Sequence, residues 1–231
     1  MLIGGVEVGL DDLRHVYWIG GAPGAGKSTI ARRLADRHGM YLYATDDVMS
    51  DHLSRTTPEE SPYLSRFAAM DMDERWLNRS PLTMLETFHW FRGECFALIV
   101  EDLVRLREGG IPVVAEGFRL LPQLVQPLLA EPREGDRRSK PPERQPVQAV
   151  WLLPTPGFRA AALESRGSTW TIAGRTSAPE RALANLVERD RMFTERLAEE
   201  TGRLSLPAIH LEVGGLSEDE LDREVSRIFG L

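Results

Sequence analysis

The chain contains 231 residues, of which 28 are basic and 35 acidic, so its formal net charge is −7. This length suits one α/β domain with a small insertion, and the acidic balance argues against general binding to nucleic acids, whose phosphates attract positive surfaces. Because no apolar run approaches the roughly 18 residues of a membrane span and no basic region with an apolar core opens the chain, we expect a cytoplasmic protein without membrane contact.

The first predicted elements are short strands followed by a helix. Leu2–Ile3 and Val6–Val8 are apolar enough for a small strand or hairpin. His15–Gly20 is mostly apolar, with β-branched and aromatic residues, which predicts a buried strand. After a glycine-rich loop, apolar residues recur at helical spacing from Ile30 onward, and Gly39 is a natural stop for that helix.

The glycine-rich loop reads Gly-Ala-Pro-Gly-Ala-Gly-Lys-Ser at positions 21–28 and fits the pattern G-x-x-x-x-G-K-[ST]. Glycines allow the backbone N–H groups to surround phosphates, and the following helix N-terminus adds partial positive charge. We expect Lys27 to reach the β- and γ-phosphates of ATP and the Ser28 hydroxyl to ligate Mg²⁺. The predicted nucleotide-binding residues are Gly21, Ala22, Pro23, Gly24, Ala25, Gly26, Lys27, Ser28 and Thr29.

A second strand, Met40–Ala44, ends in Thr45, Asp46 and Asp47. Carboxylates just beyond the C-terminal end of a strand lie where ligands bind in open parallel sheets. Thr45 or Asp46 could instead cap the helix that follows. Because capping explains one polar residue better than two adjacent aspartates, we expect a functional role for at least one aspartate.

Residues 51–80 lack a clean period, and their proline-punctuated starts favour short helices, so we interpret them as an insertion over the site. Ser80-Pro81 predicts the start of one long helix that ends near Gly109, with His89 and Arg92 on one face, either toward a cleft or toward solvent. Cys95 lies in this segment, and as the only cysteine it excludes an intrachain disulfide and a cysteine-based zinc site.

A third strand, Ile111–Ala115, ends in Glu116. An acceptor facing Ser28 is what a Mg²⁺ shell or an attacking hydroxyl needs, so Glu116 is a candidate site residue. A short helix is expected from Leu120 to Ala130. Residues 131–146 hold four prolines and almost no apolar residue, which predicts a mobile surface loop.

The remaining elements alternate again between strand and helix. Strands are expected at 147–153 and 207–213, helices at 156–166 and 179–201, and a last helix capped by Ser217 with Glu220. The segment 166–178 between two helices is polar, glycine-bounded and flanked by arginines, which favours a lid that closes over a transferring phosphate. Its candidate cations are Arg166, Arg175 and Arg181, although each could also face solvent.

With these elements placed, the sequence resembles the P-loop small-molecule and nucleotide kinases, a group that includes shikimate, gluconate, adenylylsulfate and nucleoside-monophosphate kinases and chloramphenicol phosphotransferase. The resemblance rests on residues 20–29, the acidic residues 45–47, the helical insertion and the arginine-bearing lid. It implies a single α/β domain over 1–231, a P-loop NTPase three-layer sandwich with a five-stranded parallel sheet, a helical substrate-side insertion and a helical lid.

The resemblance also implies roles for particular residues. Asp46 or Asp47 is the implied base, and Arg175 is the implied lid cation. The third strand departs from the family pattern, because Glu116 stands where an aspartate is usual. The magnesium ligands are therefore expected among Ser28, Asp47 and Glu116, and the catalytic residues among Lys27, Asp46, Asp47, Glu116 and Arg175.

The predicted function is an ATP- and Mg²⁺-dependent transfer of a phosphate to a hydroxyl or phosphate of a small molecule. The insertion, rich in aromatic residues and methionines, either packs internally or shapes a partly apolar acceptor pocket for a natural-product hydroxyl. A nucleotide acceptor would instead require convergent arginines, for which Arg66, Arg92 and Arg119 are available. The alternatives are a nucleotide-binding regulatory ATPase and a nucleic-acid 5′-end kinase; the sequence does not indicate the oligomeric state.

Overall fold

The computed structural model describes residues 2–3, 6–7, 13–129, 147–165 and 172–231. The predicted loop at 131–146 and the first part of the predicted lid, 166–171, lie outside the described residues. The two short N-terminal segments form an antiparallel pair, β1 (Leu2–Ile3) and β2 (Val6–Glu7), as expected. In the described part of the chain we find no helix whose length and apolar content would suit a membrane span.

The centre of the molecule is a five-stranded sheet in the order β4-β5-β3-β6-β7, and every neighbouring pair is parallel. These strands are β3 (Val16–Gly21), β4 (Tyr41–Ala44), β5 (Val113–Glu116), β6 (Ala149–Pro154) and β7 (Ala208–Leu211). The α/β fold with a five-stranded parallel sheet is therefore confirmed. The central strands β3, β5 and β6 are almost continuously apolar and buried, as strands covered on both faces must be.

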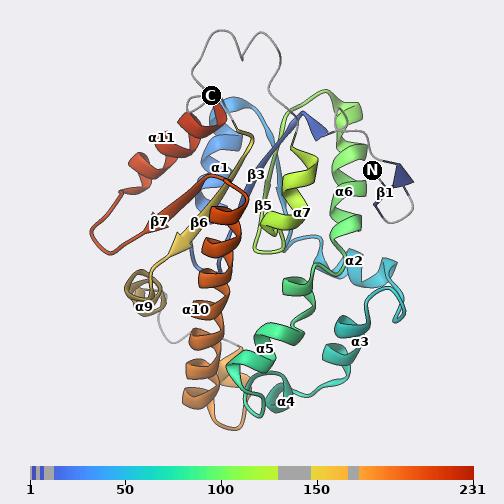
Figure 1. Cartoon of the computed structure of the whole chain (residues 1–231), viewed down its shortest axis with the longest axis vertical. Coiled ribbons are helices and arrows are strands. Elements are labelled where there is room, and N and C mark those ends of the chain that lie inside the picture. The colour runs from blue at the N-terminus through green and yellow to red at the C-terminus, as the bar shows by residue number, and fades with distance from the viewer. Residues whose placement is uncertain (1, 4–5, 8–12, 130–146, 166–171) are drawn as a thin grey trace.

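Helices cover both faces of the sheet and create two separate hydrophobic cores (Figure 1). On one face, α1 (Lys27–His38) and α11 (Glu218–Phe229) pack against alternate strand residues such as Ile19, Val114 and Val150. On the other face, α6 (Phe96–Leu106), α7 (Pro122–Val125) and the long α10 (Pro179–Arg203) pack against Trp18 and Trp151. Because side chains alternate between the two faces of each strand, every strand contributes residues to both cores. The molecule therefore has three layers, with helices on each side of the sheet.

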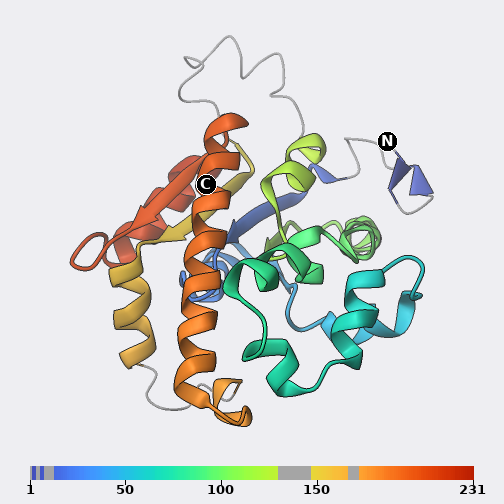
Figure 2. The same cartoon turned by 60° about the horizontal axis from the view of Figure 1, so that its bottom comes forward.

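The insertion after β4 contains the short helices α2 (Met49–Arg55), α3 (Pro62–Ala69), α4 (Met72–Trp76) and α5 (Pro81–Thr87). Figure 2 shows these helices on one side of α10 and α9 (Pro156–Ser165) on the other. Phe67, Trp76 and Phe88 pack edge to face within the insertion, with ring centroids 5.2 Å and 5.4 Å from Phe67. The packing interpretation of the aromatic residues is therefore supported.

The long helix predicted from Ser80 to Gly109 is wrong. Ser80 does cap α5, accepting a hydrogen bond from the Thr83 N–H, but the helix ends at Thr87 and the backbone of Phe88 is extended. A 3-10 turn, η2 (His89–Arg92), follows, and the chain then reverses through left-handed conformations at Gly93 and Cys95 before α6 begins. The apolar spacing matched a helix, but the aromatic side chains of this segment pack in several directions, as the stacking of Phe91 on Phe193 at 3.7 Å shows.

The C-terminal elements follow the prediction closely. Helices α9 and α10 and strands β6 and β7 begin and end within a few residues of the expected bounds. The last helix carries the predicted capping box, in which Ser217 and Glu220 exchange side-chain and backbone hydrogen bonds. The short connections η3 (Arg107–Gly109), η4 (Gln126–Leu128) and η6 (Ala173–Arg175) complete the described chain.

Candidate phosphate-binding and active site

The glycine-rich loop connects β3 to α1 and borders a cavity of about 250 Å³. Gly24 and Gly26 adopt φ values of 76° and 75°, a conformation that side chains disfavour, and Gly26 is the residue from which α1 starts. The cavity lies at the C-terminal ends of β3, β4 and β5, where ligands bind in open parallel sheets. It is lined by Pro23, Gly24, Gly26, Lys27, Ser28, Thr29, Asp46, Glu116, Phe118 and Arg159.

Lys27 is the first residue of α1 and is only 7% exposed. Its Nζ donates a hydrogen bond of 2.9 Å to the carbonyl oxygen of Ala22, so the ammonium group lies across the loop. Burial lowers the pKa of Lys27, while the negative charges of Glu116 and Asp46 oppose that shift. A cation held between two carboxylates beside a helix N-terminus is suited to an anionic phosphate chain.

Glu116 is the last residue of β5 and is 4% exposed. The parallel register sets it beside Ile19 of β3 and Ala44 of β4. The Ser28 hydroxyl donates a hydrogen bond of 2.9 Å to Glu116 Oε1. Burial raises the pKa of Glu116, while Lys27 and the bond from Ser28 lower it. The predicted pairing of Ser28 with an acidic residue across the sheet is thus present.

The two aspartates after β4 have different positions. Both residues are exposed, but Asp46 lines the cavity and Asp47 is not among the lining residues. Desolvation raises the pKa of the Asp46 carboxyl, against the positive charges of Lys27 and Arg119. The capping alternative is wrong, because α2 begins at Met49 with Val48 at the N-cap position.

The oxygens around the cavity fit a magnesium ion. The Ser28 hydroxyl and the carboxylates of Glu116 and Asp46 all face the space beside Lys27, and hard oxygen donors are what Mg²⁺ prefers. The set is small, as expected for an ion that keeps several waters and binds substrate phosphates as well.

Arg159 is a site residue that the sequence interpretation missed. It is the fourth residue of α9, is buried, and lines the cavity. Its guanidinium group lies so close to the loop that a Cβ on Gly24 would be 2.0 Å from Nη1. Arg159 donates to Asp190 of α10 at 2.8 Å. The only sequence signal was its place at the start of the helix that leaves the ligand-binding end of β6.

Arg175, the predicted lid cation, lies at the end of η6, is exposed, and is not among the residues that line the cavity. Arg181 is exposed near the start of α10, and Arg166 lies outside the described residues. Most of the predicted nucleotide-binding residues line the cavity, namely Pro23, Gly24, Gly26, Lys27, Ser28 and Thr29. The other three, Gly21, Ala22 and Ala25, belong to the same loop.

A buried polar network supports the turn that carries Asp46. Arg119 donates to the Thr45 carbonyl at 3.0 Å and to His52 Nδ1 at 2.8 Å. His52 Nε2 lies 2.7 Å from Asp102 Oδ2, and Arg55 pairs with Asp102 Oδ1 at 2.8 Å. Arg119 and Arg55 already bind the His52 ring and the Asp102 carboxylate, so these groups do not present free ligands to a metal. The network instead connects α2, α6 and the loop after β5.

The arginines proposed from the sequence for a nucleotide acceptor do not converge. Arg66 and Arg92 are exposed and lie over the Tyr63 ring at 5.9 Å and 5.2 Å. Arg119 is buried and lies over a different ring, that of Trp90, at 4.9 Å.

No protein-family model matches the chain, and no curated protein matches its sequence. Among solved structures, the chain is similar to deoxyadenosine kinase from M. mycoides with bound dATP, with a TM-score of 0.43, 11% identity, and coverage of 92% of this chain and 98% of that one. For the same enzyme with bound dCTP the TM-score is 0.41 at 13% identity, with coverage of 94% and 100%. Since this likeness is low, a ligand for this chain has to follow from its own residues.

Proposed function

We propose that the protein is a P-loop kinase that transfers the γ-phosphate of ATP to a small-molecule acceptor. The observation that carries this proposal is the convergence of Lys27, Ser28, Asp46 and Glu116 on one cavity beside a glycine loop and a helix N-terminus. A loop that only turned the chain would need none of these four side chains. We further propose that the chain forms one kinase domain, with residues 51–80 on the acceptor side.

The loop residues 21–29 would hold the phosphates of ATP. Lys27 would exchange its bond to the Ala22 carbonyl for the β- and γ-phosphate oxygens. Ser28 and Glu116 would hold Mg²⁺, with Asp46 or Asp47 nearby; the bound ion would offset the negative charge of the phosphates. In this arrangement the hydrogen bond from Ser28 to Glu116 preorganises two oxygens before the nucleotide binds.

Asp46 is the proposed base for the acceptor. Its carboxylate lines the cavity, and burial raises its pKa, which makes it a better proton acceptor than an ordinary aspartate. Arg159 would stabilise the charge that spreads over the transferred phosphate, because its guanidinium group lies directly over Gly24 of the loop. The lid over 166–178, with Arg175 as its cation, remains a prediction for the closed state.

The experiment that tests this function measures the release of ADP and the transfer of γ-labelled phosphate from Mg·ATP. The acceptors are nucleosides, nucleoside monophosphates, hydroxylated natural products and a DNA or RNA 5′-hydroxyl end. ADP release that rises with one small-molecule class, with the label on that molecule, supports the proposal. Equal ADP release with and without every acceptor would indicate a regulatory ATPase instead, and labelling of the nucleic-acid end would indicate an end kinase.

A further inference from the structure

The guanidinium group of Arg159 extends from the glycine loop to helix α10. Its Nη1 lies on the loop side, where a Cβ on Gly24 would be only 2.0 Å away. Its Nη2 donates a hydrogen bond of 2.8 Å to Asp190 Oδ2 on α10. Because a guanidinium group is a rigid planar fork, the position of the acceptor at one end decides where the other end points.

The Asp190 carboxylate is fixed from two sides. It is 2% exposed, and each of its oxygens accepts from a different arginine. Oδ2 accepts from Arg159, whereas Oδ1 accepts from Nε and Nη2 of Arg189 at 3.0 Å and 2.6 Å. Rotation of the carboxylate would break bonds on both sides, so Asp190 offers Arg159 an acceptor in one fixed place. A buried ion pair is weak evidence for stability, but it can specify a geometry.

The part of α10 that carries Asp190 is itself attached to the insertion. Asn185 Nδ2 donates to the carbonyl oxygen of Trp76 at 3.4 Å and to that of the next residue at 3.1 Å. The Arg189 guanidinium group lies over the rings of Trp76 and Phe88 at 5.3 Å and 5.2 Å. Because Asn185 and Arg189 lie just before Asp190 in the helix, these contacts hold the carboxylate in place.

Arg159 also has space beside it. A second cavity of about 90 Å³ lies between α9 and α10 and is bordered by Pro23, Arg159 and Asp190. Pro23 and Arg159 also line the phosphate cavity, so Arg159 borders both spaces. Since roughly 10–15 Å³ of such space accommodates one water molecule, the smaller cavity has room for a guanidinium group. Without a fixed partner, the guanidinium group could turn away from the loop into this space.

The charges of the pair act on Lys27. Burial lowers the pKa of Lys27, and of the two charges in the pair, that of Arg159 lowers it further whereas that of Asp190 raises it. Asp190 therefore offsets part of the repulsion between Arg159 and Lys27, two cations that line the same cavity.

We propose that Asp190 is a positioning residue for phosphate transfer, which holds the Arg159 guanidinium group over the glycine loop and keeps it out of the smaller cavity. This inference rests on the proposed function, in which Arg159 stabilises the charge on the transferred phosphate. Asp190 is not among the residues that line the phosphate cavity, so its effect on the reaction passes through Arg159. A misplacement of about 1 Å can cost about 10²-fold in rate.

The kinetic test compares Asp190→Asn, Arg159→Met and the double variant. It measures the release of ADP from Mg·ATP with water as the phosphate acceptor, and with any acceptor that the transfer assay identifies. We expect Asp190→Asn to lower kcat by about 10–100-fold and to leave the KM for ATP nearly unchanged. The double variant should be no slower than Arg159→Met alone, because a residue that acts through Arg159 has no effect once Arg159 is gone.

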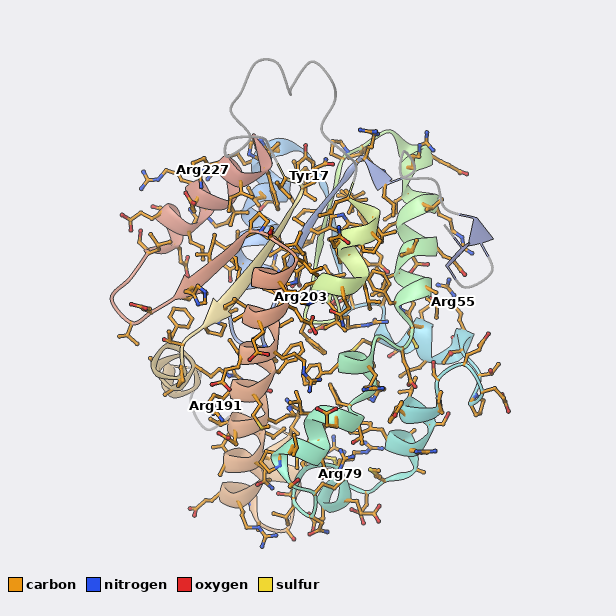
Figure 3. The ribbon with its side chains drawn as sticks, in the orientation of Figure 1. Tyr17, Arg55, Arg79, Arg191, Arg203 and Arg227 are labelled. Carbon is orange, nitrogen blue, oxygen red and sulfur yellow. The ribbon has the colours of Figure 1, made fainter. Side chains whose placement is uncertain are left out.

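Glu188→Gln is the matched control. Glu188 lies on the same helix, and its carboxylate accepts from Arg191 at 2.7 Å and 2.9 Å, much as that of Asp190 accepts from Arg159. Figure 3 shows Arg191 on α10. The pair is partly exposed, and Glu188 is not among the residues that line either cavity. We therefore expect kcat to stay at the wild-type value.

A second measurement follows Arg159 itself, without nucleotide. In nitrogen NMR spectra, a guanidinium group that rotates slowly shows separate Nη signals, which are assigned to Arg159 by their absence from Arg159→Met. We expect slow rotation in the wild type and in Glu188→Gln, and fast rotation in Asp190→Asn. Should Asp190→Asn not fold, Arg189→Met/Asp190→Asn replaces it, because that variant also removes the second cation that the carboxylate binds.

Three results would overturn the proposal: an Asp190→Asn variant with wild-type kcat, a double variant in which the two losses multiply, and slow rotation of Arg159 in Asp190→Asn. The proposed function fails separately. If Mg·ATP does not raise the Tm of the wild type and no ADP is released, the phosphate site is wrongly assigned, and the NMR comparison still decides whether Asp190 holds Arg159.

Discussion

The Ser28 hydroxyl donates a 2.9 Å hydrogen bond to the Glu116 carboxylate, joining the start of α1 to the end of β5. The two residues are 88 positions apart in sequence, and the parallel pairing of β3 with β5 brings them together. The contact holds an oxygen pair beside Lys27. Under the proposed function, this contact would make the binding of Mg²⁺ and that of ATP parts of one arrangement.

The first prediction concerns Glu116→Gln. The amide keeps the size of the side chain and the bond from Ser28 but removes the negative charge that a magnesium ligand needs. We expect the Mg²⁺ concentration for half-maximal activity to rise by about 10–100-fold, with a smaller change in nucleotide binding without metal. A magnesium titration of ADP release measures this, and an unchanged dependence on Mg²⁺ would exclude Glu116 from the metal site.

The second prediction distinguishes Asp46 from Asp47. Because only Asp46 lines the cavity, Asp46→Asn should lower kcat by about 10²–10⁴-fold, while the adjacent Asp47→Asn serves as a matched control with a smaller effect. Steady-state kinetics with saturating ATP and acceptor measure both. If Asp47→Asn proves the more damaging, the roles of the two aspartates are reversed; if both remain fully active, Glu116 becomes the candidate base.

The third prediction concerns Arg159→Met. Loss of the guanidinium group over Gly24 should lower kcat by about 10²–10³-fold, because a positioned charge acts most strongly on the transition state. Arg175→Met is compared in the same assay, since the family resemblance assigns the lid cation there. A large loss for Arg175→Met with little loss for Arg159→Met would move the catalytic cation to the lid.

The fourth prediction follows from His89. Its pKa is about 3 in the folded state and 6.5 ordinarily, so between these values the unfolded chain binds a proton that the folded chain does not. The stability that neutral His89 allows is therefore complete above pH 6.5 and is lost as the pH falls. Relative to His89→Asn, the wild type should lose up to about 1.4 kcal/mol of unfolding free energy per pH unit in this window.

Urea unfolding of both proteins at several values between pH 6.5 and pH 4.5 measures this difference. Parallel curves for the wild type and His89→Asn would show that His89 titrates normally and that the surrounding arginines do not act on it.

The sequence was sufficient to predict the elements that depend on local chemistry. The glycine loop at 21–28, the carboxylates at the ends of β4 and β5, the Ser80 cap and the capping box of Ser217 are readable from residue types and spacing alone. The partnership of Ser28 with Glu116 was also predictable in outline, since the C-terminal ends of parallel strands share one edge of the sheet.

The sequence did not predict the contacts and burial that depend on three-dimensional packing. Arg159 and Asp190 are 31 positions apart and meet only because α9 and α10 lie side by side. The break at Phe88 was missed because its apolar spacing is compatible with a helix, and only the aromatic cluster shows why it must leave that helix. The burial of Arg119 has no sequence signal, because its neighbours in the sequence do not distinguish it from the exposed arginines of this chain.

The measurement that tests the central claim most directly is heat-induced unfolding of the wild type and Lys27→Ala with Mg·ATP. At a hundred times its Kd, a ligand that binds only the folded state adds about 2.7 kcal/mol to the unfolding free energy. We predict a clear rise in the Tm of the wild type and none for Lys27→Ala, which should fold normally because its side chain faces the cavity. The absence of any nucleotide shift in the wild type would contradict the assignment of residues 21–29 as an ATP site, and with it the kinase.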